Sequence, residues 1–215
     1  MRGSSTPDAH LEIRWFRNSA EYRALTRQTY RYAGERVPEL ARGLPARGWA
    51  VILDADETVL DNSIYQEQRA PLGGYSDDSW VQWVRKRAAA AVPGSVEFAQ
   101  QVHALGGRIV IVTNRADSLC VDTRENLRSL RIDPELVLCM PPGESNKNPR
   151  FQRVQAGTAG LPPLTVVAWL GDNIQDFPNM TQAGRGSAAF FADFGVKYFA
   201  LPNPMYGSWT ANTSP

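Results

Sequence analysis

Short runs of apolar residues, many of them branched at Cβ, alternate along the chain with longer segments of amphipathic pattern. Uninterrupted apolar runs of this length are typical of strands that are buried on both faces of a sheet. Six runs are predicted to be strands: Val51–Leu53, Arg108–Asn114, Leu136–Cys139, Thr165–Leu170, Ala188–Phe191 and Tyr198–Leu201. The first run matters most for function, because acidic residues follow it directly.

The segments between these runs have the pattern of helices. A helix that begins at Asn18 or Ser19 is predicted to reach about Pro38. Further helices are predicted at about 93–105, 117–130 and from 150 to at least 155. Because strand and helix alternate throughout, we predict an α/β fold: a doubly wound, mainly parallel, Rossmann-like sheet with helices on both faces.

A length of 215 residues suits a single domain, 1–215, with a proper core. We expect an N-terminal helical segment at about 18–43 to pack on the outside of the sheet. A polar and aromatic insertion at about 61–92 is too short to be a separate domain, and it contains a helix from Asp77 through Trp80 to the alanines that follow. Because the insertion directly follows the first acidic strand end, we expect it to act as a lid or a specificity wall.

Two carboxylates, Asp54 and Asp56, follow the first predicted strand with one residue between them. Open α/β sheets bind their ligands at the carboxyl ends of the strands, so chemistry is expected here. In an extended chain both side chains point the same way, and their repulsion requires a cation or a shared proton. Mg²⁺ prefers oxygen ligands, which predicts that a second acidic strand end contributes to the site. Asp172, after the fourth long strand, meets this expectation.

The other strand ends and one loop carry groups that suit a phosphate. Thr113 and Asn114 end the second strand, Lys147 lies in the loop after the third, and Asp176 follows Asp172. Phosphoryl transfer requires cations and hydrogen-bond donors around charged oxygens, together with a nucleophile such as a carboxylate. Each feature alone has a simpler explanation as a turn, a helix cap or a surface lysine. Their occurrence in order at successive strand ends favours a single phosphoryl-transfer site.

Several motifs make the chain resemble a known family. The motifs are Asp54–Ser63, Val112–Arg115, Lys147 with Arg150–Phe151, Gly171–Phe177 and Leu201–Trp209. On these motifs the chain is similar to the class C acid phosphatases of the haloacid dehalogenase superfamily, and more narrowly to their bacterial lipoprotein 5′-nucleotidase branch. The resemblance runs from about residue 15 to residue 209. It implies a haloacid dehalogenase-like fold with a small cap insertion.

The resemblance implies a role for each matching residue. Asp54 is the expected nucleophile and a Mg²⁺ ligand, and Asp56 is the expected general acid and base, bound to the metal through its backbone carbonyl. Asp172 completes the expected metal ligands, and Asp176 is expected to hold metal-bound water. The residues expected to grip the phosphate are Thr113, Asn114 and Lys147. Asn62 is expected to contact the rest of the substrate. Tyr206 is expected to stack on one face of a nucleobase, and Tyr75 or Trp80 on the opposite face.

Composition and cysteine content bear on partners and compartment. The formal net charge of +1, with charges scattered along the chain, argues against nucleic acid as a partner. No apolar run approaches the length of a transmembrane segment. Cys120 and Cys139 lack the spacing of a metal site, so free buried thiols are favoured and a single disulfide is the alternative. Residues 1–4 resemble an expression leader that replaced a native export signal.

The resemblance further implies an exported, periplasmic enzyme that forms a homodimer. A lipid anchor is not supported, because no cysteine precedes Cys120. The chain also departs from the family at 88–91, where alanines stand in place of an expected arginine near the active site. The predicted function is a Mg²⁺-dependent phosphomonoesterase that acts on nucleoside 5′-monophosphates through a phospho-aspartate. The alternatives are a broad-specificity acid phosphatase, a phosphotransferase and a non-catalytic module that binds metal and phosphate. The presence of Asp54, Asp56, Lys147 and Asp172 argues against the last alternative.

Overall fold

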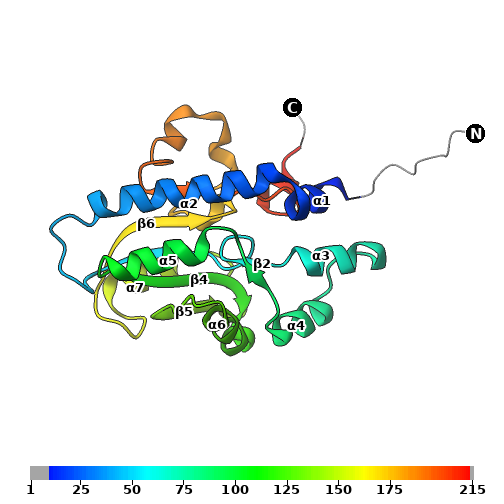
Figure 1. The fold of residues 1–215 in the computed structure, drawn as a ribbon, viewed down its shortest axis with the longest axis horizontal. Helices are drawn as coiled ribbons and strands as arrows, with labels where there is room; N and C mark the ends of the chain where they lie inside the picture. Colours follow the sequence, from blue (N-terminus) through cyan, green and yellow to red (C-terminus); the bar gives the residue numbers. More distant parts are fainter. Residues whose placement is uncertain (1–9, 214–215) are drawn as a thin grey trace, which may run out of the picture.

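A five-stranded parallel sheet lies at the centre of the computed structural model, which describes residues 10–213 (Figure 1). The leader-like residues 1–4 lie outside the described range. The strand order is β5-β4-β1-β6-β7, and every neighbouring pair in it is parallel. The strands are β1 Trp49–Leu53, β4 Arg108–Ala116, β5 Leu136–Met140, β6 Thr165–Gly171 and β7 Tyr198–Ala200. The predicted parallel α/β fold is confirmed.

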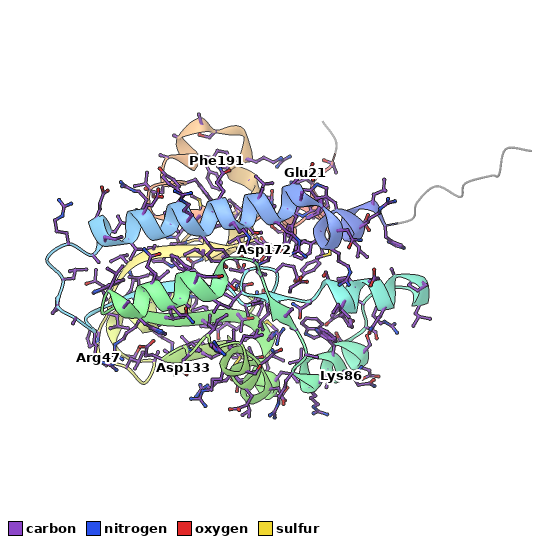
Figure 2. All side chains as sticks on the ribbon, in the orientation of Figure 1. Glu21, Arg47, Lys86, Asp133, Asp172 and Phe191 are labelled. Atoms are coloured by element: carbon purple, nitrogen blue, oxygen red, sulfur yellow. A yellow bond between two sulfur atoms is a disulfide. The ribbon has the colours of Figure 1, made fainter. Side chains whose placement is uncertain are left out.

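Helices cover both faces of the sheet. The α-helices of residues 10–213 are α1 Leu11–Asn18, α2 Ala20–Leu40, α3 Ser63–Arg69, α4 Asp77–Lys86, α5 Ser95–Ala104, α6 Cys120–Ser129 and α7 Asn148–Ala156, and of these α2, α5 and α6 cover one face and α7 the other. Val51 and Leu53 share a core with α2, α5 and α6, whereas Ala50 and Ile52 share a second core with α7 (side chains in Figure 2). Burial of both faces explains why these strands are uninterrupted apolar runs. Within residues 10–213, no helix combines the length and the apolarity needed to span a membrane.

The chain leaves the sheet after β1 and returns through a two-stranded ribbon. In this ribbon β2, Leu60–Asp61, pairs antiparallel with β3, Ala90–Ala91, and α3 and α4 lie between the two strands in sequence. Both helices project beyond the end of the sheet in Figure 1. Helix α4 ends where Arg87 adopts a left-handed conformation with φ 53°. The predicted helix from Asp77 to the alanines is therefore confirmed as α4, and the chain turns at Arg87 before Ala90 and Ala91 form β3.

One predicted strand is corrected by the structure. Ala188–Phe191 forms a 3-10 helix, in which the N–H of Phe190 donates to the carbonyl of Ser187 at 3.1 Å. The side chain of Phe191 is 41% exposed, so this apolar run is not enclosed between two layers as its composition suggested. The predicted late strand at 198–201 is confirmed as β7, the edge strand.

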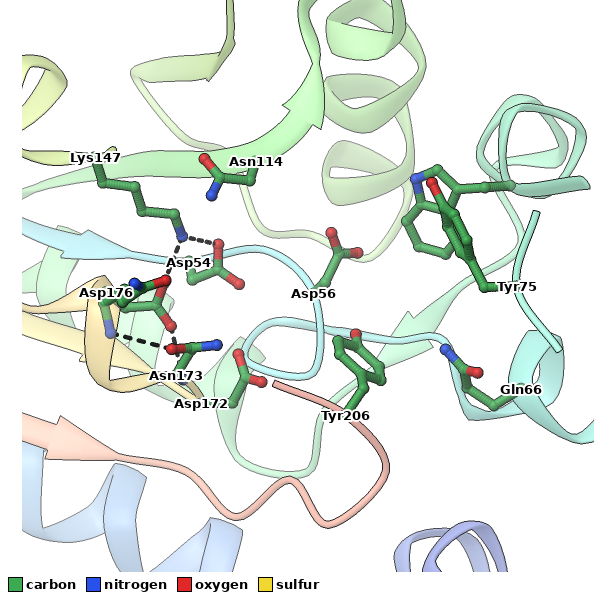
Figure 3. Close-up of a pocket in the computed structure, with 12 residues that line it drawn as sticks. Asp54, Asp56, Gln66, Tyr75, Asn114, Lys147, Asp172, Asn173, Asp176 and Tyr206 are labelled. Carbon is green, nitrogen blue, oxygen red and sulfur yellow. Dashed lines mark hydrogen bonds and ion pairs between the residues drawn. The ribbon is translucent and has the colours of Figure 1, made fainter. Parts of the chain in front are cut away.

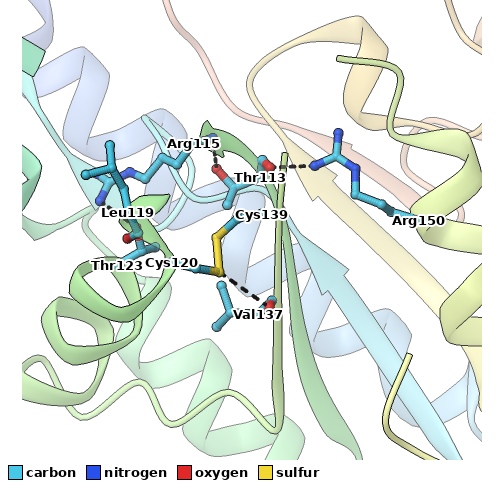
Figure 4. Close-up of a disulfide and its surroundings, with 8 residues drawn as sticks. All are labelled: Thr113, Arg115, Leu119, Cys120, Thr123, Val137, Cys139 and Arg150. Atoms are coloured by element: carbon cyan, nitrogen blue, oxygen red, sulfur yellow. Dashed lines mark hydrogen bonds between the residues drawn. A yellow bond between two sulfur atoms is a disulfide. The ribbon is translucent and has the colours of Figure 1, made fainter. Parts of the chain in front are cut away.

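The state of the two cysteines is also corrected. The sequence pattern favoured free thiols, but Cys120 and Cys139 form a disulfide (Figure 4). It joins the first residue of α6 to β5, and the two Cα atoms lie 5.8 Å apart, within the usual range for a bridge. Only the packing of α6 beside β5 brings the two residues together, and the spacing of the cysteines in the sequence does not reveal it.

Reduction of this disulfide is expected to lower the thermal stability of the protein. A cross-link between residues 19 positions apart restricts the unfolded chain, which is worth about 3 kcal/mol in the chain-entropy model. For a chain of this size the midpoint of thermal unfolding should fall by about 6–12 °C. Calorimetry with and without a reductant measures the shift. A Cys120→Ser, Cys139→Ser variant should unfold at one temperature in both conditions, and an unshifted wild type would contradict the expectation.

Candidate active site

A tight turn after β1 places the first acidic side chains at the edge of the sheet. The carbonyl of Ala55 accepts two hydrogen bonds across this turn, at 2.8 and 2.9 Å, and Glu57 adopts φ 53° within it. The Glu57 carboxyl is fully buried and accepts a hydrogen bond from the backbone N–H of Asn62 at 2.8 Å. Burial raises the pKa of Glu57 well above its usual range. The buried Glu57 side chain thus supports the turn from within, and Asp54 and Asp56 face the cavity beyond it.

A cavity of about 410 Å³ opens between the carboxyl ends of the central strands and the insertion (Figure 3). Its lining combines groups from the strand ends, the insertion and the C-terminal segment: Asp54, Asp56, Gln66, Tyr75, Trp80, Asn114, Lys147, Asp172, Asn173, Gln175, Asp176 and Tyr206. The cavity therefore brings together every predicted site residue except Asn62 and Thr113. Lys147 and Asp176 lie at one side in Figure 3 and Tyr75 and Gln66 at the other.

Lys147 is buried, and its ammonium group lies between two carboxylates. The Nζ atom donates to Oδ1 of Asp54 and, at 2.6 Å, to Oδ1 of Asp176. Burial raises the pKa of Asp54 to about 7, although the charge of Lys147 acts in the opposite direction. Burial also lowers the pKa of Lys147, but the two carboxylates outweigh burial and raise that pKa overall. The ammonium group is therefore a permanent positive charge in the floor of the cavity.

Three carboxylates converge beside this lysine. One oxygen each from Asp54, Asp172 and Asp176 lie within 4.8 Å of one another. Loss of solvation raises the pKa of Asp172 well above its usual range, and the neighbouring carboxylates add to the effect. Lys147 offsets one of three negative charges, and a divalent cation would neutralise the remaining two. Carboxylate oxygens in this arrangement fit a hard cation such as Mg²⁺.

Two predicted site residues lie behind the cavity wall. Asn62 is fully buried, donates to Oδ1 of Asp56 at 2.8 Å and accepts from Nε1 of Trp83 at 2.8 Å. Thr113 is also fully buried, and its hydroxyl accepts a hydrogen bond from the backbone N–H of Arg115 at 3.1 Å. Both side chains contact neighbouring site residues and do not line the cavity. The position of Asn62 therefore does not support the predicted direct contact with substrate.

Four residues of the site escaped the sequence prediction. Gln66, Asn173 and Gln175 line the cavity, and Arg115 donates to Asp56 at 2.7 Å. A glutamine on a short helix or in a loop is usually solvated, so Gln66 and Gln175 carried no signal of their own. Arg115 did carry a signal, because a charged residue near the end of a buried strand must find a partner or reach water.

Three comparisons with known proteins agree on one family. Residues 5–209 match the HAD superfamily, subfamily IIIB (acid phosphatase). The class C acid phosphatase from Bacillus anthracis, solved with tungstate bound, is 31% identical, with 92% of this chain and 84% of that chain covered and a TM-score of 0.79. A second structure of that enzyme gives 30% identity with the same coverage and TM-score. Acid phosphatase 1 from Solanum lycopersicum is 25% identical over 158 residues, 72% of this chain, and the chain spans 57% of the length of that relative.

The fold and these matches place the chain among the haloacid dehalogenase-type phosphatases. The chain belongs to the acid phosphatases of subfamily IIIB, a family of phosphomonoester hydrolases. Within that family its structural match is to a class C enzyme, which confirms the resemblance drawn from the motifs.

Proposed function

We propose that this chain is a Mg²⁺-dependent phosphomonoesterase that hydrolyses nucleoside 5′-monophosphates through a phospho-aspartate on Asp54. The observation that carries the proposal is the convergence of Asp54, Asp172 and Asp176 beside the buried ammonium of Lys147. A carboxylate nucleophile, metal ligands and a fixed cation in one cavity are the components that phosphoryl transfer requires. When bound by these carboxylates, Mg²⁺ would neutralise negative charge on the phosphate oxygens.

The proposed reaction has two steps, and Asp54 and Asp56 take part in both. In the first step an oxygen of Asp54 attacks phosphorus, the ester P–O bond breaks, and Asp56 donates a proton to the leaving oxygen. In the second step water attacks the phosphorus of the phospho-aspartate, Asp56 accepts the proton of that water, and inorganic phosphate leaves Asp54. Lys147 and Asn114 line the cavity, and we assign them to the phosphate oxygens. The part assigned to Thr113 stays a prediction, because its hydroxyl is buried behind the wall.

The preference for nucleotides is supported by aromatic side chains in the part of the cavity away from Lys147. Tyr206, Tyr75 and Trp80 all line it, and Trp80 packs beside Tyr75 with ring centroids 6.2 Å apart. The Tyr75 side chain is well exposed, so a base that stacked on it would cover apolar surface that water now contacts. Stacking on an aromatic ring is worth about 1–3 kcal/mol per base and depends little on which base is present.

Tyr206→Ala is expected to reduce kcat/KM for a nucleoside 5′-monophosphate by about 5- to 150-fold, the equivalent of one stacking interaction. The loss for p-nitrophenyl phosphate or a sugar phosphate should be smaller, because neither carries a base. Steady-state kinetics on the three substrates measure the difference.

Tyr32→Ala is a matched control for this substitution. Tyr32 is also a partly exposed tyrosine, but it lies on α2 in a different groove. We expect its removal to leave all three kcat/KM values unchanged. Equal losses on every substrate for Tyr206→Ala would mean that Tyr206 supports its loop, and the proposal would then reduce to a general acid phosphatase.

The proposed function as a whole is tested by a panel of phosphomonoesters assayed with Mg²⁺ and with a chelator. We expect phosphate release that depends on Mg²⁺ and is fastest for nucleoside 5′-monophosphates. An added alcohol that captured most of the phosphoryl group would indicate a phosphotransferase. Binding of phosphate and metal without any turnover would indicate a non-catalytic module and would contradict the proposal.

An exported, periplasmic location is also part of the proposal. The disulfide between Cys120 and Cys139 supports it, because structural disulfides persist in oxidising compartments and are rare in the cytosol. Fractionation of native cells, followed by thiol labelling, tests this point. The chain should be recovered outside the cytosol, and neither cysteine should react with the label because both are in the disulfide. The expected homodimer is tested separately by sedimentation velocity.

A further inference from the structure

The carboxylate of Asp56 is held on one side by a buried arginine. Arg115 is 2% exposed, and its Nε and Nη2 atoms donate to Oδ1 of Asp56 at 2.9 and 2.7 Å. The side-chain amide of Asn62 donates to the same oxygen at 2.8 Å. Among residues 10–213, every hydrogen bond to the Asp56 side chain ends on Oδ1. Asp56 also lines the cavity, so Oδ2 is the oxygen available to a substrate.

Arg115 is itself held in place from the side of α6. Its Nη1 atom donates to the hydroxyl of Thr123 at 3.3 Å, and that hydroxyl donates to the carbonyl of Leu119 at 2.9 Å. Leu119 directly precedes Cys120, whose disulfide to Cys139 ties this corner to β5 (Figure 4). The guanidinium group therefore has a fixed position on a part of the fold that is covalently cross-linked.

The insertion contacts the same arginine. The ring of Trp80 lies against the guanidinium, with its centroid 5.4 Å from the Cζ atom of Arg115. Asn62 accepts from Nη2 of Arg115 at 3.1 Å and from Nε1 of Trp83 at 2.8 Å. Trp80 and Trp83 both belong to α4, so α4 packs on the group that holds Asp56.

We propose that Arg115 is the positioning residue for Asp56, and that it makes Oδ2 the oxygen that carries the catalytic proton. The proposal rests on the proposed function, in which Asp56 is the general acid. Oδ1 already accepts three N–H bonds, so a proton placed there would displace one of them. In the first step the Oδ2–H bond breaks as the bond from hydrogen to the leaving oxygen forms. In the second step Oδ2 takes the proton from the attacking water.

Arg115→Lys would keep the positive charge but lose the planar pair of N–H donors, Nε and Nη2, that both donate to Oδ1 of Asp56. The Asp56 carboxyl would then rotate among several orientations, and most of them aim Oδ2 away from the leaving oxygen. Proton donation by a well-placed acid contributes about 10²- to 10⁴-fold to the rate. Loss of this proton donation lowers the rate most for substrates whose leaving oxygen is strongly basic.

The experiment compares Arg115→Lys with the wild type on glycerol phosphate, which has an alkoxide leaving group, and on p-nitrophenyl phosphate, whose leaving group is a stabilised anion. We expect kcat/KM for glycerol phosphate, which reports the first step alone, to fall by about 100-fold, the lower range for a lost general acid. The fall for p-nitrophenyl phosphate should be less than about tenfold, because p-nitrophenolate departs with little protonation.

Arg108→Lys is the matched control. Arg108 is also a buried arginine of β4, but it lies at the opposite end of that strand, where its Nε atom donates to the carbonyl of Arg47 at 2.8 Å. We expect kcat/KM on both substrates to be unchanged in this variant. Circular dichroism verifies that each variant is folded. If Arg115→Lys does not fold, the near-isosteric Thr123→Val removes the hydroxyl that accepts from Nη1 and donates to the carbonyl of Leu119, and it should show a smaller loss that is again confined to glycerol phosphate.

Asp56→Asn separates this proposal from the function on which it rests. The single Asp56→Asn variant should discriminate between the two leaving groups, and adding Arg115→Lys to it should cause no further loss. Equal losses on both substrates for Arg115→Lys, with Asp56→Asn still discriminating, would overturn the positioning role and leave the proposed function intact. If Asp56→Asn lost the same factor in kcat/KM on both substrates, the acid role of Asp56 would be overturned, and the positioning role of Arg115 with it.

Discussion

Asp54→Asn is expected to abolish turnover and to leave the fold intact. An amide does not attack phosphorus, so the covalent route is lost, and kcat should fall by several orders of magnitude. The change is almost isosteric and removes a carboxylate whose burial raises its pKa to about 7, so we expect no loss of stability large enough to unfold the protein. The measurement is phosphate release from a nucleoside 5′-monophosphate at saturating Mg²⁺.

Asp193→Asn is the control for this experiment. Asp193 is an exposed carboxylate that pairs with Lys197 at 3.1 Å and does not line the cavity. We expect full activity for this variant. If Asp54→Asn retained more than a tenth of the wild-type activity, Asp54 would not be the nucleophile.

Asp172→Ala is expected to weaken the response to Mg²⁺ severely. Asp172 is one of three carboxylates that converge within 4.8 Å, and its loss leaves too few direct protein ligands to hold the ion. Loss of a residue that merely supports a ligand typically costs 10- to 100-fold in metal affinity, so the loss of a ligand should raise the Mg²⁺ concentration for half-maximal activity by about 100-fold or more. A Mg²⁺ titration of activity, started from chelator-treated enzyme, measures this shift.

Asp133→Ala removes a carboxylate that is well exposed and remote from the cavity, and its Mg²⁺ titration should match that of the wild type. The decisive contrary result is a wild type that stays fully active in chelator. That result would remove the basis for any metal at the acidic cluster.

Three of the proposed site residues were predictable from the sequence because they lie at strand ends that the hydrophobic pattern makes visible. Asp54, Asn114 and Asp172 stand at or just beyond the ends of β1, β4 and β6, and parallel strands bring such positions to one edge. Lys147 follows no strand end directly. Its place in the site was predicted from the loop after the third strand and from the family motif, but its burial between Asp54 and Asp176 was not evident from its loop position.

The remaining features depend on packing between segments that are distant in the chain. The disulfide requires α6 to lie beside β5, and the contact of Arg115 with Asp56 requires β4 to lie beside β1. Neither arrangement follows from local periodicity. The run at 188–191 was misread for a related reason: apolar composition suggested burial, but β7 already closes this edge of the sheet.

The central position of β1 has a consequence for the order of folding. Both neighbours of β1 come later in the chain, and the second of them, β6, begins only at Thr165. A chain that is synthesised from its amino end therefore cannot pair β1 on both sides, or assemble its acidic cluster, until residues 165–176 have appeared, and the edge strand β7 follows only at 198–200. Long-range pairings of this kind delay folding, because the intervening chain must first be closed into loops. The sheet thus stays incomplete during most of the chain's emergence.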